Sequence, residues 1–120
     1  MTVADVAAVA AVGLGGSAGA VARYGVGRVV AGRRATAAVN VAGSFLLGVV
    51  SATSVGSRLA LLLGVGFCGA FTTYSSFAVA VGGLLADDDH EAAVRFGAGT
   101  LLAAVAAVVL GRLLVITAAG

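Results

Sequence analysis

Four apolar segments, separated by charged residues, make up most of the chain. They run from Val6 to Ala22, from Ala35 to Ser57, from Leu59 to Ala86, and from Phe96 to about Ile116. Each is close to the roughly 20 residues that a helix needs to cross the hydrocarbon core of a bilayer. The pattern therefore predicts an all-α membrane protein, a single domain over residues 1–120, with transmembrane helices at about 3–24, 35–56, 59–85 and 93–116.

The third segment has its poorest helix-forming stretch at its centre. Residues 64–77 read GVGFCGAFTTYSSF, which is three glycines followed by Thr-Thr-Tyr-Ser-Ser. Glycine weakens a helix by about 1 kcal/mol relative to alanine, and β-branched and hydroxyl residues also rank low. A break here would release backbone carbonyls at membrane depth, where they are tolerated only inside protein or beside a polar cavity. The stretch therefore predicts a third helix that is broken near its centre and an ion site at the break.

The composition agrees with a membrane location. The chain is 61% hydrophobic and only 10% charged, whereas soluble domains carry about 25% charged residues. Its mean hydropathy is +1.15. The net charge of +2 comes from a few scattered arginines, which is not the concentrated basic surface that nucleic-acid binding requires.

Glycines in the first segment read GLGGSAG over residues 13–19. A dinucleotide-binding loop would need an acidic residue about 20 positions later, and no Asp or Glu occurs between Asp5 and Asp87. Gly15 and Gly19 instead form a small-xxx-small pair, which lets two membrane helices approach closely. Arg23, at the end of this segment, is either an anchor that reaches the headgroups or a fixed positive charge at the mouth of an anion path.

Asn40 is the strongly polar residue of the second segment. An amide in a membrane helix is costly unless it finds partners, so Asn40 either makes an interhelical hydrogen bond or lines a pore as a donor. Its NH2 group and the nearby Ser44 hydroxyl can both donate to an anion.

Aromatic residues and a hydroxyl recur at helical spacing in the last two segments. Tyr74 and Phe77 share one helical face, either as a packing stripe or with positive ring edges turned toward a dehydrated anion. Phe96, Thr100 and Ala104 follow one another at four-residue intervals. The Thr100 hydroxyl can bond back to its own helix or project toward a path.

Three blocks of this sequence resemble the motifs of the CrcB/Fluc fluoride channels. GGSAGAVARY at residues 15–24 is similar to the family's GGxxGAxxRY, and NVAGSFLLG at residues 40–48 is similar to its NxxGSFxxG. GFCGAFTTYSSF at residues 66–77 is similar to its GFCGGFTTFSTF, which is a highly specific motif. The blocks occur in the family's order, and the resemblance covers nearly the full chain.

The resemblance implies a fold and a function. Members form antiparallel, dual-topology dimers with two fluoride paths, and passively export F⁻ across the cell membrane. A structural Na⁺ lies at the dimer centre, which by motif position implies the backbone carbonyls of Gly69 and Thr72 as its ligands. The resemblance places the remaining path residues at Arg23, Asn40, Ser44, Tyr74, Phe77, Phe96 and Thr100.

This chain departs from the family pattern at several positions. Tyr74 stands where Phe is usual, Ala70 replaces a glycine, Phe96 replaces a common Tyr, and Ala37 replaces a common Leu. Five arginines are expected toward one side of the membrane and two toward the other, a bias that favours one orientation. The partner is therefore either a second copy or an oppositely oriented paralogue.

Two other interpretations are open from sequence. A small multidrug exporter also has four short helices, but it relies on a membrane-embedded carboxylate that these segments lack. A non-transporting assembly protein would explain the glycines but not the hydroxyl-rich break. An enzyme is not expected, because no paired carboxylates or nucleophile–base set lies within the segments.

Overall fold

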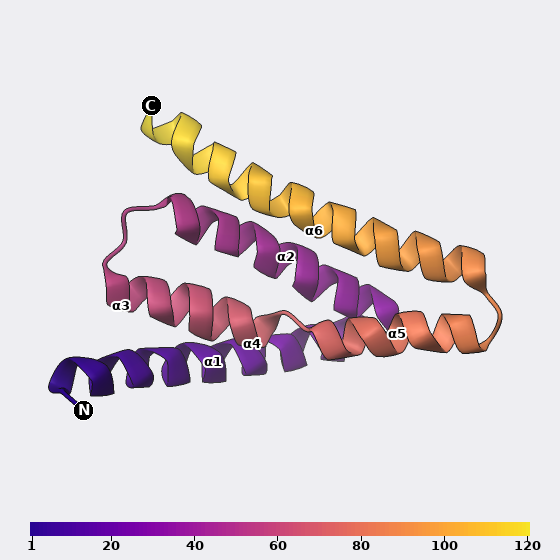
Figure 1. The fold of residues 1–120 in the computed structure, drawn as a ribbon, viewed down its shortest axis with the longest axis horizontal. Helices are drawn as coiled ribbons and strands as arrows, with labels where there is room; N and C mark the ends of the chain where they lie inside the picture. The colour runs from indigo at the N-terminus through magenta and orange to yellow at the C-terminus, as the bar shows by residue number, and fades with distance from the viewer.

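The computed structural model describes residues 1–120 as a bundle of helices, four of which are long and apolar enough to cross a membrane (Figure 1). The first is α1 (Val3–Val29), the second α2 (Arg33–Ala52) and the last α6 (His90–Ala119). The third span is divided into α3 (Ser57–Ala60), the π-helix η1 (Leu61–Cys68), α4 (Gly69–Phe71) and α5 (Tyr74–Ala86). The all-α fold with an interrupted third membrane helix is therefore confirmed.

Helix ends differ from the expected boundaries by several residues. α1 continues to Val29 instead of ending near residue 24, because the glycines that follow Tyr24 weaken a helix without stopping it. α2 ends at Ala52 rather than near residue 56. α6 begins at His90, where the Asp89 side chain accepts a hydrogen bond from the Ala92 N–H at 3.1 Å and caps the helix.

α1 and the third span meet backbone to backbone. A Cβ added to Gly15 would lie 1.9 Å from the Leu62 carbonyl oxygen, and one added to Gly19 would lie 2.3 Å from the Phe67 carbonyl oxygen. Gly66 completes the contact from the other helix, since its Cβ would fall 2.7 Å from the Val12 oxygen. The small-xxx-small pair therefore joins two helices of the same chain.

α2 and α6 use the same kind of contact. A Cβ at Gly48 would lie 2.2 Å from the Val108 oxygen, and one at Gly111 would lie 2.4 Å from the Phe45 oxygen. The subunit thus consists of two closely packed helix pairs, α1 with the third span and α2 with α6. Figure 1 shows α2 between the third span and α6, with both chain termini at the same end of the bundle.

Few side chains are enclosed by the subunit itself. Only 15 of 120 residues are buried, and large apolar side chains such as Leu14, Val79 and Leu102 are two-thirds or more exposed. Lipid tails or a second protein chain must cover these surfaces, because every span is apolar around most of its circumference. The arrangement fits a membrane protein whose apolar surfaces are covered by its surroundings.

Candidate functional site

The third span is broken at two residues, Thr72 and Thr73. Both have extended backbones, with φ/ψ of −80°/162° at Thr72 and −148°/117° at Thr73. The Thr72 N–H still donates to the Cys68 oxygen at 3.1 Å, as in a helix. The Thr73 N–H does not continue this series, and the gap is visible between α4 and α5 (Figure 1).

Asn40 on α2 holds the broken backbone through both ends of its amide. Its Oδ1 accepts from the Thr73 N–H at 2.7 Å, and its Nδ2 donates to the Thr73 oxygen at 3.0 Å. The interhelical hydrogen bond, one of the two expectations for Asn40, is therefore present. An amide nitrogen carries two hydrogens, and only one is used in this pair.

The break leaves several carbonyls without a backbone donor. No N–H donates to the oxygens of Gly69, Ala70 or Phe71, because their usual helical donors, the N–H groups of residues 73–75, lie beyond the break. The Thr72 oxygen accepts from Arg23 Nη1 at 3.3 Å. Free carbonyls at mid-helix are what the glycine and hydroxyl composition of this stretch predicted.

Arg23 lies at the level of the break and not at the end of the bundle. α1 runs about another helical turn and a half beyond Arg23, to Val29. The guanidinium extends sideways to the third span and bonds the Thr72 oxygen instead of reaching toward headgroups. A fixed positive charge therefore stands beside the extended residues. Five arginines were expected toward one side of the membrane. Four of them, Arg28, Arg33, Arg34 and Arg95, lie toward that end, and the fifth, Arg23, lies at the break.

An open groove of about 420 Å³ runs along the break between α2, the third span and α6. It brings together seven of the nine residues that the sequence singled out, namely Asn40, Ser44, Gly69, Thr72, Tyr74, Phe77 and Thr100. The rest of its lining is mostly apolar, with Leu47, Val65 and Leu101 among the walls. Arg23 and Phe96 do not line it.

Two serine and threonine hydroxyls in this groove have no protein partner. Neither Ser44 nor Thr100 makes a side-chain hydrogen bond, and Thr100 does not bond back to its own helix. Thr100 is nonetheless a buried residue, with 7% of its surface exposed. No buried side-chain oxygen or nitrogen lacks a partner, so the Thr100 hydroxyl remains accessible from the groove, and the groove offers two free donors.

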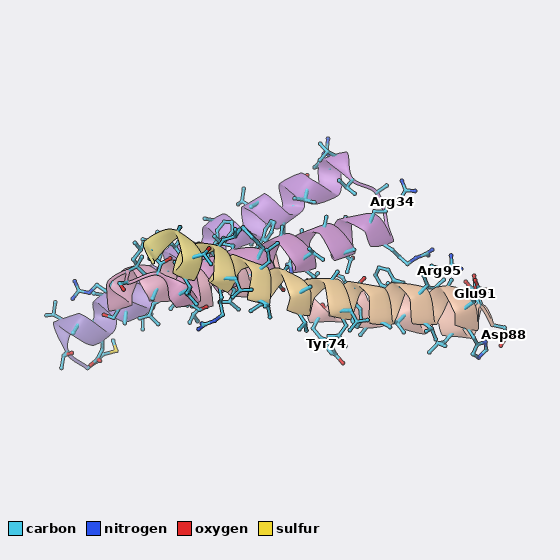
Figure 2. All side chains as sticks on the ribbon, turned by 90° about the horizontal axis from the view of Figure 1, so that it is seen from above. Arg34, Tyr74, Asp88, Glu91 and Arg95 are labelled. Atoms are coloured by element: carbon cyan, nitrogen blue, oxygen red, sulfur yellow. The ribbon has the colours of Figure 1, made fainter.

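Aromatic rings extend from the groove toward the end where α6 begins. The ring centroids of Tyr74 and Phe77 are 6.3 Å apart, and those of Phe77 and Phe96 are 5.8 Å apart. Phe96 lies outside the groove but continues the series from α6. Tyr74 is 82% exposed and projects away from the bundle (Figure 2), so its hydroxyl has no partner within the subunit.

Thr73 is a site residue that sequence reasoning missed. Besides pairing with Asn40, its Oγ1 accepts from the Ser76 N–H at 3.2 Å and caps α5. Threonine directly before a resuming apolar helix is an N-cap signal, and it could have located the restart of the helix. Its pairing with a residue 33 positions away could not be read from local sequence.

Comparison with known proteins bears on what this groove does. Residues 10–112 match the family model described as "CrcB-like protein, Camphor Resistance (CrcB)". A relative from Natronomonas pharaonis, named fluoride-specific ion channel FluC 2, is 55% identical over 84% of this chain and 88% of its own length.

The chain belongs to the CrcB family.

Two further CrcB relatives extend the comparison. A fluoride-specific ion channel FluC 2 from Rhodococcus jostii is 44% identical over 83% of this chain and 91% of its own length. The fluoride-specific ion channel FluC of Chlorobaculum tepidum is 42% identical over 86% of this chain and 90% of its own length. Together with the four apolar spans, membership of CrcB makes this chain a multi-pass protein of the cell membrane.

Proposed function

We propose that this chain forms a fluoride-selective channel through which F⁻ leaves the cytoplasm passively, lowering fluoride toxicity. The observation that carries the proposal is the groove beside the broken helix, where the amide of Asn40 and two hydroxyls without partners, those of Ser44 and Thr100, line a mostly apolar space. Relatives of 42 to 55% identity are named fluoride-specific ion channels.

The chemistry of the groove suits a small, strongly hydrated anion. Fluoride loses water when it enters a narrow path, so donors must replace that water. Asn40, Ser44 and Thr100 supply such donors, and all three residues line the same groove. The rings of Tyr74 and Phe77 add electropositive edges, which are weak individually and act only alongside the donors.

The freed carbonyls fit a structural Na⁺. Carbonyl oxygens are suitable ligands for a hard monovalent cation without any carboxylate, and the Gly69 oxygen has no hydrogen-bond donor. Gly69 is exposed on the subunit surface, so a second copy could bring its own Gly69 and Thr72 to the same ion. The Thr72 oxygen is shared with Arg23, and Na⁺ would compete with the guanidinium for it. When bound, Na⁺ would hold two broken helices together and favour anions nearby.

The assembly we propose is an antiparallel dimer, with either a second copy or an oppositely oriented paralogue as the partner. The open groove, the exposed Gly69 and the projecting Tyr74 lie along one region of the subunit and need a cover. Four arginines toward one end against two toward the other give a modest orientation bias. Relatives carry both names FluC 1 and FluC 2, which is consistent with species that hold two such chains.

The test is anion efflux from proteoliposomes that contain the purified chain alone, with Na⁺ present. We expect F⁻ efflux that is far faster than Cl⁻ efflux in the same vesicles. Equal rates for the two anions would exclude a fluoride-selective path. If the folded chain passes no fluoride alone but passes fluoride when a paralogue is added, the channel is a heteromeric assembly.

A further inference from the structure

A second groove lies at the end of the bundle where α2 and α6 begin. It has a volume of about 730 Å³ and is enclosed by the last residues of α1, the turn that follows them, the start of α2 and the first turns of α6. Because it lies at helix ends, we expect it at the boundary between hydrocarbon and headgroups. It adjoins the region of the break, since the rings of Phe96 and Phe77 are 5.8 Å apart and Arg33 shares a smaller hollow with Ser75 and Ser76.

The groove combines concentrated positive charge with apolar walls. Three of its nine lining residues are arginines, Arg33, Arg34 and Arg95, and none is acidic. The side chains of Arg33 and Arg34 form no hydrogen bond or ion pair, whereas the Arg95 side chain is paired with Glu91, one turn earlier on α6. Arg34 and Arg95 lie at the same end of the molecule (Figure 2). The remaining residues are Val29, Val30, Ala31, Ala37, Ala92 and Phe96.

We propose that this groove binds one anionic phospholipid. The phosphate is held by the guanidinium groups of Arg33 and Arg34, which form planar, bidentate pairs with phosphate oxygens. One acyl chain lies along the apolar wall formed by Ala37, Ala92 and Phe96. Basic pockets between membrane helices suit this class of ligand, because charge and hydrocarbon are satisfied together.

The groove has a charged part and an apolar part, and this combination distinguishes a lipid ligand from a soluble anion. A free phosphate needs only the guanidinium groups and gains nothing from contact with valine, alanine or phenylalanine side chains. A general preference for positive charge on one side of the membrane would place arginines at this end, but it would not gather them around a hollow with apolar walls. The proposal does not depend on what the channel conducts.

Native mass spectrometry of the intact, full-length assembly tests the proposal, with phosphatidylglycerol and phosphatidylcholine offered in equal amounts. We expect the wild type to retain phosphatidylglycerol preferentially, up to one molecule per subunit. The R33Q/R34Q double variant should lose this preference by about tenfold or more, because each basic residue near a membrane surface contributes about 1 kcal/mol to binding anionic lipid. The R58Q variant is the matched control, since Arg58 lies at the opposite end and should leave retention unchanged.

A second variant tests the apolar half without altering charge. Ala37→Phe fills the groove while both arginines are kept, and it should reduce lipid retention although the surface charge is the same. Thermal unfolding of each variant shows that the fold is intact. Equal retention of the two lipids by the wild type, or undiminished retention by R33Q/R34Q, would overturn the proposal. So would displacement of the lipid by millimolar inorganic phosphate, which would identify a site for free anions.

Discussion

Asn40 and Thr73 form a two-point hydrogen bond across the helix break, with Asn40 Oδ1 accepting from the Thr73 N–H and Asn40 Nδ2 donating to the Thr73 carbonyl. The amide thus replaces the two hydrogen bonds that Thr73 loses when the helix is interrupted. An unpaired backbone group buried away from water costs about 1–3 kcal/mol. One side chain on α2 therefore stabilises a break located on another helix.

The substitution Asn40→Asp tests both functions of this residue. A carboxylate still accepts from the Thr73 N–H, but it cannot donate, so the Thr73 oxygen loses its partner and faces a negative charge. We expect the free energy of unfolding to fall by about 1–3 kcal/mol and F⁻ efflux to be strongly suppressed. Thermal unfolding and proteoliposome efflux measure the two effects. Ser44→Ala, which removes no hydrogen bond, is the stability control, and normal efflux through the Asp variant would remove Asn40 from the path.

A substitution at Gly19 tests the contact between α1 and the third span. A Cβ there would lie 2.3 Å from the Phe67 oxygen, so Gly19→Ala must push the two helices apart and should destabilise the subunit by about 1–3 kcal/mol. Gly13→Ala is the matched control on the same helix, because no atom lies within 4 Å of the added Cβ. It should be neutral or stabilising by up to about 1 kcal/mol. If both variants unfold at the same temperature, the helices are not held by backbone contact.

Thr100→Val separates a role in conduction from a role in folding. The two side chains have the same shape, and the Thr100 hydroxyl makes no hydrogen bond in the subunit, so stability should change by less than about 0.5 kcal/mol. F⁻ efflux should fall by about tenfold if the hydroxyl replaces water around the ion, since a hydrogen bond to a charged group contributes about 1.5–3 kcal/mol. Thr117→Val is the control, because that hydroxyl bonds the Leu113 oxygen of its own helix at 2.8 Å. Undiminished efflux through Thr100→Val would exclude the hydroxyl as an ion contact.

Arg23→Gln tests the proposed Na⁺ site by removing the guanidinium that competes with Na⁺ for the Thr72 oxygen. The guanidinium donates to the Thr72 oxygen at 3.3 Å, and its charge opposes a cation at the same oxygen. Removing the charge should lower the Na⁺ concentration that gives half-maximal stabilisation, measured by thermal unfolding in mixtures of Na⁺ and a large organic cation. Arg112→Gln is the control, because Arg112 donates to Ser51 near the opposite end at 3.0 Å. An unchanged Na⁺ dependence in Arg23→Gln would place the ion elsewhere or show that none binds.

The break was predictable because its cause is local. Glycines at 64, 66 and 69 and the hydroxyl run that follows are poor helix formers wherever they stand. The two residues that become extended, Thr72 and Thr73, fall inside that run. The four spans were likewise predictable, since their length and hydropathy are properties of each segment alone.

The partners of the polar side chains were not predictable, because they depend on how distant helices are placed. Asn40 and Thr73 are 33 positions apart, and Arg23 and Thr72 are 49 apart. Arg23 was expected near the mouth of the path or among headgroups, and its actual place follows from the length of α1. Gly48 and Gly111 could be seen as small residues, but the backbone that each one touches depends on how α2 crosses α6. The π-helical turns of η1 have no signal in the sequence that we can identify.

Both termini lie at the same end of the bundle (Figure 1), which limits how two copies can be encoded as one gene. A direct head-to-tail fusion would return the second copy to the membrane in the same orientation as the first. An inverted pair on a single polypeptide needs an odd number of additional membrane crossings in the linker. A fusion with one inserted hydrophobic helix would therefore allow its two halves to pair in antiparallel orientation, whereas a fusion without that helix would not.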